Sequence, residues 1–238
     1  MAKHLRPGAA SAAQESIKEY LLEHRLRPGD PLPSESVLCE QLGVSRSSVR
    51  EAIRTLSALD IVEVRHGTGT FVGNLSLDPL VNGLAFRGVL TPGEDYEALR
   101  EVVEIRTALD LGVAEPLVAA VQGTVTAGLH ELVAQMVKLS ERGEAFTAQD
   151  RAFHVALLAK LPNRLLGQMV EALWEVHTRV LPRLGVPTPA DIVETAAAHG
   201  DMLRAAERGD LGGYRTAVIR HYRPLLRVLD ASAVEGPA

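Results

Sequence analysis

Four polar residues in the second half of the chain have the types and the spacing of a metal site: Asp150, His154, His199 and His221. Asp150 and His154 are four residues apart, so on a helix both side chains lie on one face, one turn apart. His199 and His221 fall on two consecutive predicted helices, at similar distances from the turn between them, so in an antiparallel pair they can meet at one level. Three imidazoles and a carboxylate suit zinc, nickel or a similar divalent ion, with positions left open for water or a ligand.

Each of these residues also has a simpler interpretation. Asp150 follows Thr147 by three residues and could complete a helix cap. A single histidine is more often a packed or surface residue than a metal ligand, and we expect His24, His130 and His177 to be of that kind. Composition and spacing alone therefore leave the metal site as one of two interpretations.

A second group of chemically capable residues lies near position 45. Ser45, Ser47 and Ser48 cluster at the amino end of a predicted helix, where free N–H groups and the helix dipole attract phosphate. Arg46 and Arg50 are one turn apart on another face of that helix, and arginine can donate two hydrogen bonds to the edge of a guanine. These residue types indicate contacts with duplex DNA.

The elements predicted around this group follow the order of a winged helix-turn-helix. They are an amphipathic helix over 11–26, a short helix from Ser34 to Gly43, a helix capped by Ser45 with Val49, Ile53 and Leu56 as its buried stripe, and two strands at 61–65 and 69–72. The alternative is a three-helix module whose exposed arginines only improve solubility. The complete order of helix, turn, helix and hairpin favours the DNA-binding interpretation.

From about residue 78 the sequence predicts helices and no strands. Apolar periodicity places helices at 78–89, 94–120, 125–141, 147–160, 163–183, 189–208 and 211–230, with breaks that include Thr91-Pro92-Gly93 and Val186-Pro187 and a helix start at Thr188-Pro189-Ala190-Asp191. Six or seven antiparallel helices imply a bundle. The fold is therefore predicted to be mainly α, with a winged helix-turn-helix domain over 1–74 and an antiparallel all-α bundle over 75–238.

Composition and charge limit the remaining classes. No apolar run approaches the roughly 18 residues that span a bilayer, the first residues lack the apolar segment of a secretory signal, and the single cysteine, Cys39, excludes an intrachain disulfide. These features predict a cytoplasmic protein with no membrane partner. Residues 1–74 carry nine basic and nine acidic residues, so the net charge of −5 belongs to the rest of the chain. The DNA argument therefore rests on where the arginines lie and not on their number.

The segment from Leu32 to Val72 closely resembles the DNA-binding domain of GntR-family transcription regulators, through its LPSE, GVSR-x-x-VREA and HGTGTFV elements. In one departure from the family pattern, Asp60 stands where a glycine is usual, which alters the turn into the wing. The resemblance implies base or phosphate contacts by Ser45, Arg46, Ser47, Ser48 and Arg50, with His66 and Gly67 at the tip of the wing.

Residues 104–110, 150–154, 199–210 and 220–222 resemble the FCD ligand-binding domain of the FadR subgroup of the same family. Metal-binding members of that subgroup use the aspartate and the three histidines as ligands, whereas members that lack them bind acyl-CoA; this chain keeps all four. The resemblance also implies that Arg106 pairs with the carboxylate of an effector. The alternative for Arg106 is a surface or interhelical salt bridge with Glu104 or Asp110.

Together these observations predict a homodimer that presents two recognition helices to a pseudo-palindromic double-stranded DNA operator. A small carboxylate effector would bind the metal and Arg106 and relieve repression. A metal-dependent enzyme acting on a small organic acid is the alternative, but no separate general base and no HExxH-type motif is present. A helical scaffold that binds only other proteins would leave the arginines and the wing unexplained.

Overall fold

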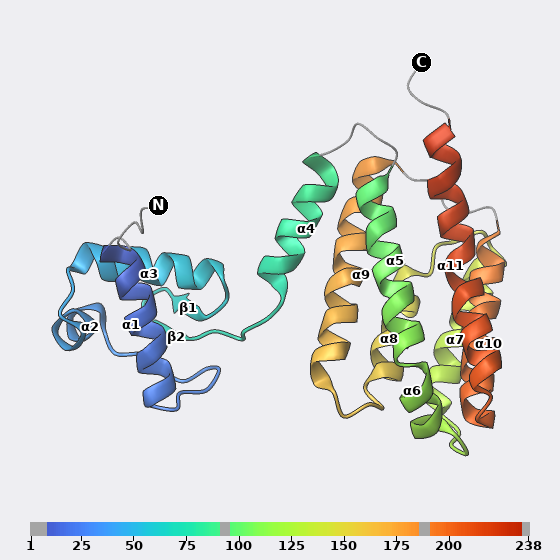
Figure 1. The fold of residues 1–238 in the computed structure, drawn as a ribbon, viewed down its shortest axis with the longest axis horizontal. Helices are drawn as coiled ribbons and strands as arrows, with labels where there is room; N and C mark the ends of the chain where they lie inside the picture. Colours follow the sequence, from blue (N-terminus) through green and yellow to red (C-terminus); the bar gives the residue numbers. More distant parts are fainter. Residues whose placement is uncertain (1–8, 91–95, 186–190, 235–238) are drawn as a thin grey trace, which may run out of the picture. The chain divides into compact units, whose positions relative to one another are not determined.

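The computed structural model describes residues 9–90, 96–185 and 191–234. They divide into an N-terminal unit that reaches Pro79 and a C-terminal unit that begins at Leu80 (Figure 1). The described part of the N-terminal unit contains α1 (Ala9–Glu23), α2 (Glu35–Leu42), α3 (Arg46–Ala58), β1 (Val62–Arg65) and β2 (Gly69–Val72). The order of these elements confirms the predicted winged helix-turn-helix.

Caps at both ends of α2 set the geometry of the helix-turn-helix. The side chain of Ser34 accepts a hydrogen bond from the amide of Val37 at the start of α2, and Gly43 ends the helix in the left-handed conformation, with φ of 66°. Ser45 then caps α3 by accepting from the amide of Ser48. The predicted stripe of α3, namely Val49, Ile53 and Leu56, is buried against α1 and α2.

The wing is a two-stranded antiparallel hairpin in which Val62 pairs with Val72 and Arg65 pairs with Gly69. Gly67 supplies the positive φ of its turn, at 74°. Asp60 precedes the wing with φ of 54°, so it adopts the left-handed conformation that a glycine would take without strain.

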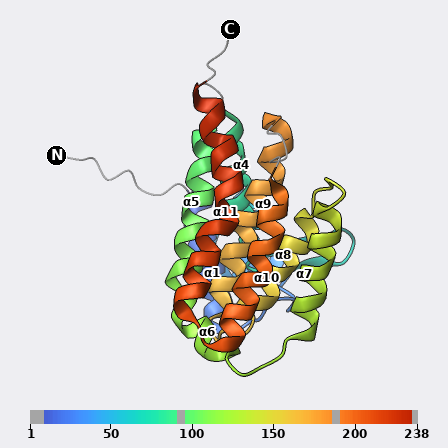
Figure 2. The ribbon, with the colours of Figure 1, turned by 90° about the vertical axis from the view of Figure 1, so that its right-hand side faces the viewer.

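The described residues of the C-terminal unit form helices joined by turns and loops, with no strand. Its elements are α4 (Asp78–Leu90, whose first two residues belong to the N-terminal unit), α5 (Glu97–Gly112), α6 (Ala114–Val121), α7 (Ala127–Ser140), α8 (Thr147–Leu158), α9 (Arg164–Leu184), α10 (Ile192–Arg208) and α11 (Leu211–Val234). Packing contacts close a ring in the order α5, α11, α10, α7, α8, α9 and back to α5; Figure 2 shows these helices side by side. The ring encloses an apolar core and confirms the predicted bundle.

Two smaller helices complete this unit. Helix α6 packs against α5, α10 and α11. Helix α4 packs against α9, where a Cβ atom added to Gly88 would lie 3.3 Å from Val180. No described helix has the length and apolar character needed to cross a bilayer.

The main difference from the predicted elements lies in residues 94–120, where one long helix was expected. The structure has two helices, because α5 ends at Gly112 and α6 begins at Ala114. Pro116 lies in the first turn of α6, and a continuous helix would set its ring against the carbonyl of Gly112. The first helix ends at Glu23, three residues earlier than predicted. The predicted breaks at 91–93 and 186–187, and most of the helix start at 188–191, lie outside the described residues.

Candidate functional site

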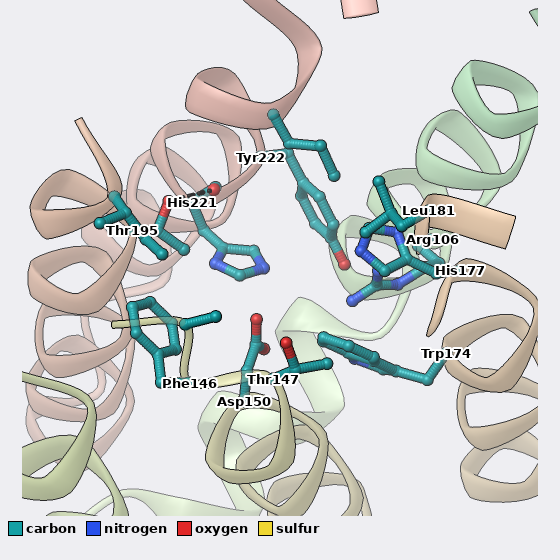
Figure 3. Close-up of a pocket in the computed structure, with 13 residues that line it drawn as sticks. Arg106, Phe146, Thr147, Asp150, Trp174, His177, Leu181, Thr195, His221 and Tyr222 are labelled. Carbon is teal, nitrogen blue, oxygen red and sulfur yellow. Dashed lines mark hydrogen bonds between the residues drawn. The ribbon is translucent and has the colours of Figure 1, made fainter. Parts of the chain in front are cut away.

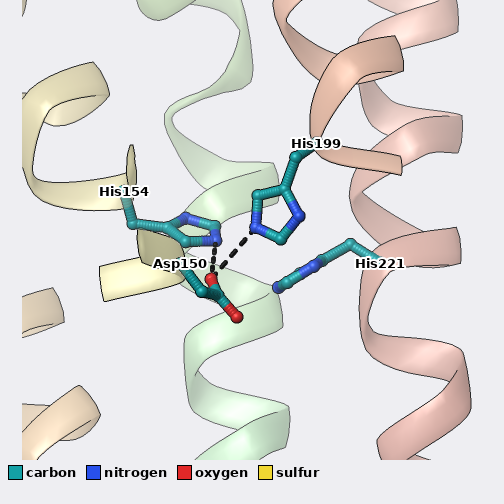
Figure 4. Close-up of side chains that lie close together, drawn as sticks. All are labelled: Asp150, His154, His199 and His221. Atoms are coloured by element: carbon teal, nitrogen blue, oxygen red, sulfur yellow. Dashed lines mark hydrogen bonds and ion pairs between the residues drawn. The ribbon is translucent and has the colours of Figure 1, made fainter. Parts of the chain in front are cut away.

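The ring of helices brings together the four residues predicted to form a metal site. Asp150 and His154 come from α8, His199 from α10 and His221 from α11, all four are buried, and their ligand atoms lie within 4.8 Å of one another. The Nε2 atoms of His154 and His199 lie 3.2 Å and 3.0 Å from the same oxygen, Asp150 Oδ1. Figure 4 shows these three side chains meeting, with the ring of His221 turned toward them.

Acceptors on the outer side of two of these rings fix the direction in which their inner nitrogens point. His199 Nδ1 lies 2.8 Å from the carbonyl oxygen of Thr195, which can only accept a hydrogen bond, so Nδ1–H donates and Nε2 faces inward. His154 Nδ1 lies 3.5 Å from Asp110 Oδ2, so a carboxylate faces the outer side of this ring. Metal-binding histidines are usually held by such an outer carboxylate or carbonyl.

The charges in this group favour binding of a cation. Burial alone raises the pKa of Asp150, but the charge of His199 and the close imidazoles of His154 and His199 outweigh burial and hold that pKa well below its usual value. Burial and the neighbouring His199 hold the pKa of His221 well below the usual range for histidine. The group therefore offers an ionised carboxylate beside a neutral imidazole, the protonation states that metal binding requires.

An unpartnered atom supports the fit to a metal. His154 Nε2 is buried and makes no hydrogen bond despite its short distance to Asp150. Metal–ligand bonds of roughly 2.1 Å place neighbouring ligand atoms roughly 3 Å apart, which is close to the separations seen here. The residues present therefore fit a divalent ion.

A cavity of about 140 Å³ opens beside the quartet. Asp150 and His221 line one side of it, and Arg106, Trp174 and His177 line the other (Figure 3). A cavity of this size has room for several water molecules or for a small organic molecule.

Arg106 lies in the wall of this cavity and not on the protein surface. Its side chain is 3% exposed, its guanidinium carbon lies 4.3 Å from the ring centre of Trp174 and 5.3 Å from that of Tyr222, and its Nε has no hydrogen-bond partner. It forms no ion pair with any described residue. The alternative of a salt bridge with Glu104 or Asp110 is therefore wrong for the described structure.

Asp110 has a different role, because it organises the cavity wall. The hydroxyl of Tyr222 donates a hydrogen bond of 2.7 Å to Asp110 Oδ2, the oxygen that also lies near His154. Burial and the Asp110 carboxylate raise the pKa of Tyr222 well above its usual value, so the hydroxyl remains a donor. Asp110 thus links the wall of the cavity to a ligand of the candidate metal site.

His177 is a packed residue outside the quartet, as expected, but it also forms part of the cavity wall. It lines the cavity, is 6% exposed and has a buried Nδ1 without a hydrogen-bond partner. Burial and the charge of Arg106 lower the pKa of His177 to about 3. The signal that could have identified it is its spacing from Trp174, three residues earlier, which places both rings on one face of α9. The other two expected bystanders lie away from the cavity: His24 is exposed, and His130 pairs with Glu207.

The predicted DNA-contacting residues gather at the amino end of α3 and at the wing. Ser45, Arg46, Ser47 and Arg50 are exposed, as are His66 and Gly67 at the turn of the wing. Ser48 differs from the prediction, because its side chain is buried and its hydroxyl lies 2.9 Å from that of Ser45. Ser48 belongs to the helix cap and does not lie on the exposed face.

Two family models match the chain. Residues 9–72 match the model described as bacterial regulatory proteins of the gntR family, and residues 101–224, more than half of the chain, match the FCD domain. The chain is a GntR-family transcription regulator with an FCD domain.

Individual relatives agree with this assignment. The galactonate operon transcriptional repressor of Escherichia coli K12 is 25% identical over 195 residues, which cover 82% of this chain and 85% of the relative. The fatty acid metabolism regulator protein of Yersinia enterocolitica is 27% identical over 171 residues, which cover 72% and 70%. The solved structure of Streptococcus agalactiae GntR shares the fold, with a TM-score of 0.61 at 23% identity over 92% of this chain and 99% of that one.

Membership of the GntR family decides between the broad function classes. Its relatives are transcription regulators and not enzymes, so the metal-dependent enzyme is not supported. The winged helix-turn-helix binds DNA, and the FCD domain is an effector domain that contains a buried group able to hold a metal ion.

Proposed function

We propose that this GntR-family regulator is a homodimeric repressor whose affinity for its operator is controlled by a small carboxylate bound beside a divalent metal. The metal, zinc or nickel, would be held by Asp150, His154, His199 and His221. Residues 1–74 would act as the DNA-binding domain and residues 75–238 as the sensor. A relative is named as the repressor of a galactonate operon, and galactonate is a carboxylate, which supports both the sign of regulation and the class of effector.

The main support for a bound metal is that two histidine nitrogens converge on one carboxylate oxygen. His154 and His199 point their Nε2 atoms at Asp150, while the outer nitrogen of His199 bonds to the carbonyl of Thr195 and that of His154 lies 3.5 Å from Asp110. Without a cation, each ring lies between two groups that only accept hydrogen bonds. A divalent ion bound by these residues would supply positive charge and open coordination positions beside the cavity.

Arg106 is the main support for a carboxylate effector. A guanidinium that is buried without an ion pair is costly, and a carboxylate in the adjacent cavity would offset that cost by accepting two parallel hydrogen bonds. A divalent ion, Asp150 and Arg106 together leave this cavity positively charged, so it favours an anion. The cavity volume of about 140 Å³ suits a small effector.

The exposed arginines of α3 are the main support for DNA contacts by this helix. Arg46 and Arg50 lie on the solvent side of a helix whose opposite face is buried, and the wing presents His66 nearby in the same unit. One such module makes too few contacts for high affinity, so a dimer on a pseudo-palindromic operator is expected. Because the target is DNA, the protein would act in the cytoplasm.

Operator titration of the full chain tests this proposal. An operator is first selected from random duplexes, and its affinity is then measured with zinc or nickel and a panel of small carboxylates. At least one acid should change the affinity of the wild type, only when the metal is present, and should fail to do so in Arg106→Met. Arg142→Met removes an exposed arginine of the same unit as a control. An equal response of Arg106→Met and the wild type would contradict the effector assignment.

A further inference from the structure

An ion pair joins the two helices of the helix-turn-helix. The Nε–H of Arg50 on α3 donates a hydrogen bond of 2.8 Å to Glu35 Oε2 at the first position of α2. The cap formed by Ser34 fixes the start of α2, and therefore the position of Glu35. The two residues are fifteen positions apart in sequence, so their contact depends on the turn between the helices and is not a local pair within one helix.

The position of this bond on the guanidinium decides which donors remain. Nε is occupied by Glu35, and Arg50 makes no other hydrogen bond or ion pair with a described residue. Its side chain is 63% exposed, so the two terminal amino groups face solvent. Those two groups form the end of arginine that can donate in parallel to O6 and N7 of one guanine.

Arg46 provides a contrast within the same helix. It is exposed and makes no hydrogen bond or ion pair with a described residue, so its long side chain keeps its rotational freedom. A mobile arginine suits a phosphate, which accepts hydrogen bonds from many directions, whereas reading a base edge requires a fixed plane. Of the two arginines, Arg50 is the one whose guanidinium bonds to a side chain of the neighbouring helix.

The ion pair has little value for folding alone. Both partners are substantially exposed, at 63% and 39%, and exposed pairs contribute little to stability. A carboxylate near the DNA backbone also repels phosphate and weakens non-specific binding. An acidic residue at this position therefore favours selectivity for sequence over overall affinity.

We propose that Glu35 is a positioning residue for sequence recognition: it fixes the guanidinium plane of Arg50 so that the two terminal amino groups read one guanine in each half-site. This inference rests on the proposed contact of Arg50 with DNA. Glu35 itself touches no base in this arrangement, and it acts by reducing the number of orientations that Arg50 can adopt.

Selection from a random duplex library tests the inference with the full chain. Wild type, Arg50→Ala, Glu35→Ala and Glu35→Gln are each used to enrich their preferred sequences, and the affinities for the wild-type site and for random duplex are then measured. Glu51→Gln is the matched control, because it removes one acidic residue that pairs with Arg54 on the outer face of α3. Thermal unfolding confirms that each variant is folded.

Arg50→Ala identifies the base position that Arg50 reads. Glu35→Ala should lose preference for guanine at that same position by roughly tenfold while binding random duplex at least as tightly as the wild type. Glu35→Gln, which keeps an acceptor of similar length, should retain part of the preference, and Glu51→Gln should retain all of it.

Three other outcomes have separate meanings. Unchanged guanine preference in Glu35→Ala would overturn the inference, and so would loss of preference at a base position that Arg50→Ala does not affect, since Glu35 would then read a base itself. Unchanged binding and preference in Arg50→Ala would instead overturn the proposed DNA contact on which the inference rests.

Discussion

Replacing His177 with phenylalanine should remove a pH-dependent part of the stability of the chain. In the folded chain burial and the charge of Arg106 lower the pKa of His177 to about 3, against 6.5 for an unperturbed histidine. A histidine whose pKa is lowered by folding stabilises the protein fully above its unfolded pKa. That contribution falls as the pH drops from about 6.5 toward about 3, because in this range His177 binds a proton in the unfolded chain and stays neutral in the folded chain.

The size of the effect follows from these two values. Between about pH 7.5 and about pH 5, His177 should lower the free energy of unfolding by roughly 2 kcal/mol. Any folded pKa below about 4 gives nearly the same figure, because proton uptake in this range is set by the unfolded chain. The prediction therefore depends on burial of His177 in the cavity wall and hardly on the size of its pKa shift.

Urea unfolding at several pH values, in the presence of a chelator, measures this effect. Between about pH 7.5 and about pH 5, the free energy of unfolding of the wild type should fall by roughly 2 kcal/mol more than that of His177→Phe. Repacking around the new side chain can add a constant difference between the two proteins, but it does not change this pH dependence. Leu181→Ala, which changes a residue of the same cavity that cannot titrate, should give a curve parallel to the wild type. Parallel curves for wild type and His177→Phe would refute the reasoning, because they would mean that the ring titrates alike in the folded and unfolded chains.

Three further outcomes are expected. Gly73→Ala should destabilise the full chain by about 2 kcal/mol in thermal unfolding, because a Cβ atom there would lie 2.3 Å from the backbone oxygen of Asp60. The control Gly83→Ala, on α4 with open space around it, should be neutral or stabilising. An equal loss of stability in the two variants would contradict the predicted clash at Gly73. Tyr222→Phe should cost about 1–3 kcal/mol in urea unfolding, since the buried Asp110 loses a hydrogen-bond donor; a loss below measurement error would argue against that bond. Fluorescence emission from Trp174, the single tryptophan, should change and then saturate when acetate is added to zinc-loaded protein. If calorimetry detects acetate binding while this emission stays unchanged, the acetate binds outside the cavity.

The sequence predicted the helical framework and the quartet well, because both depend on periodic spacing. The four-residue interval between Asp150 and His154 fixes one helix face, and the turn between α10 and α11 sets His199 and His221 at one level. Burial and convergence of these four residues in the structure agree with that geometry. Spacing along and between antiparallel helices carries over directly into three dimensions, which is why this part of the site could be anticipated.

The remaining parts of the site depend on tertiary packing and were harder to anticipate. A single arginine such as Arg106 reads equally well as a surface residue until Trp174 and Tyr222 are seen to enclose it. The place of His177 in the cavity wall could not be predicted, because one histidine on a long amphipathic helix does not show which helices it will face. The burial of Ser48 could not be predicted, because a serine cluster at a helix start indicates phosphate binding as readily as a helix cap. The division of α5 from α6 was missed, although Gly112 and Pro116 mark it.

The metal content of the full chain tests the central claim most directly. Protein equilibrated with zinc or nickel and then freed of unbound ions should retain about one ion per chain, whereas His154→Ala/His199→Ala should retain almost none while keeping its helical content. His24→Ala/His130→Ala removes two histidines outside the cavity and should retain the ion as the wild type does. Equal occupancy in the wild type and His154→Ala/His199→Ala, whether high or near zero, would contradict the assignment of the metal to the quartet.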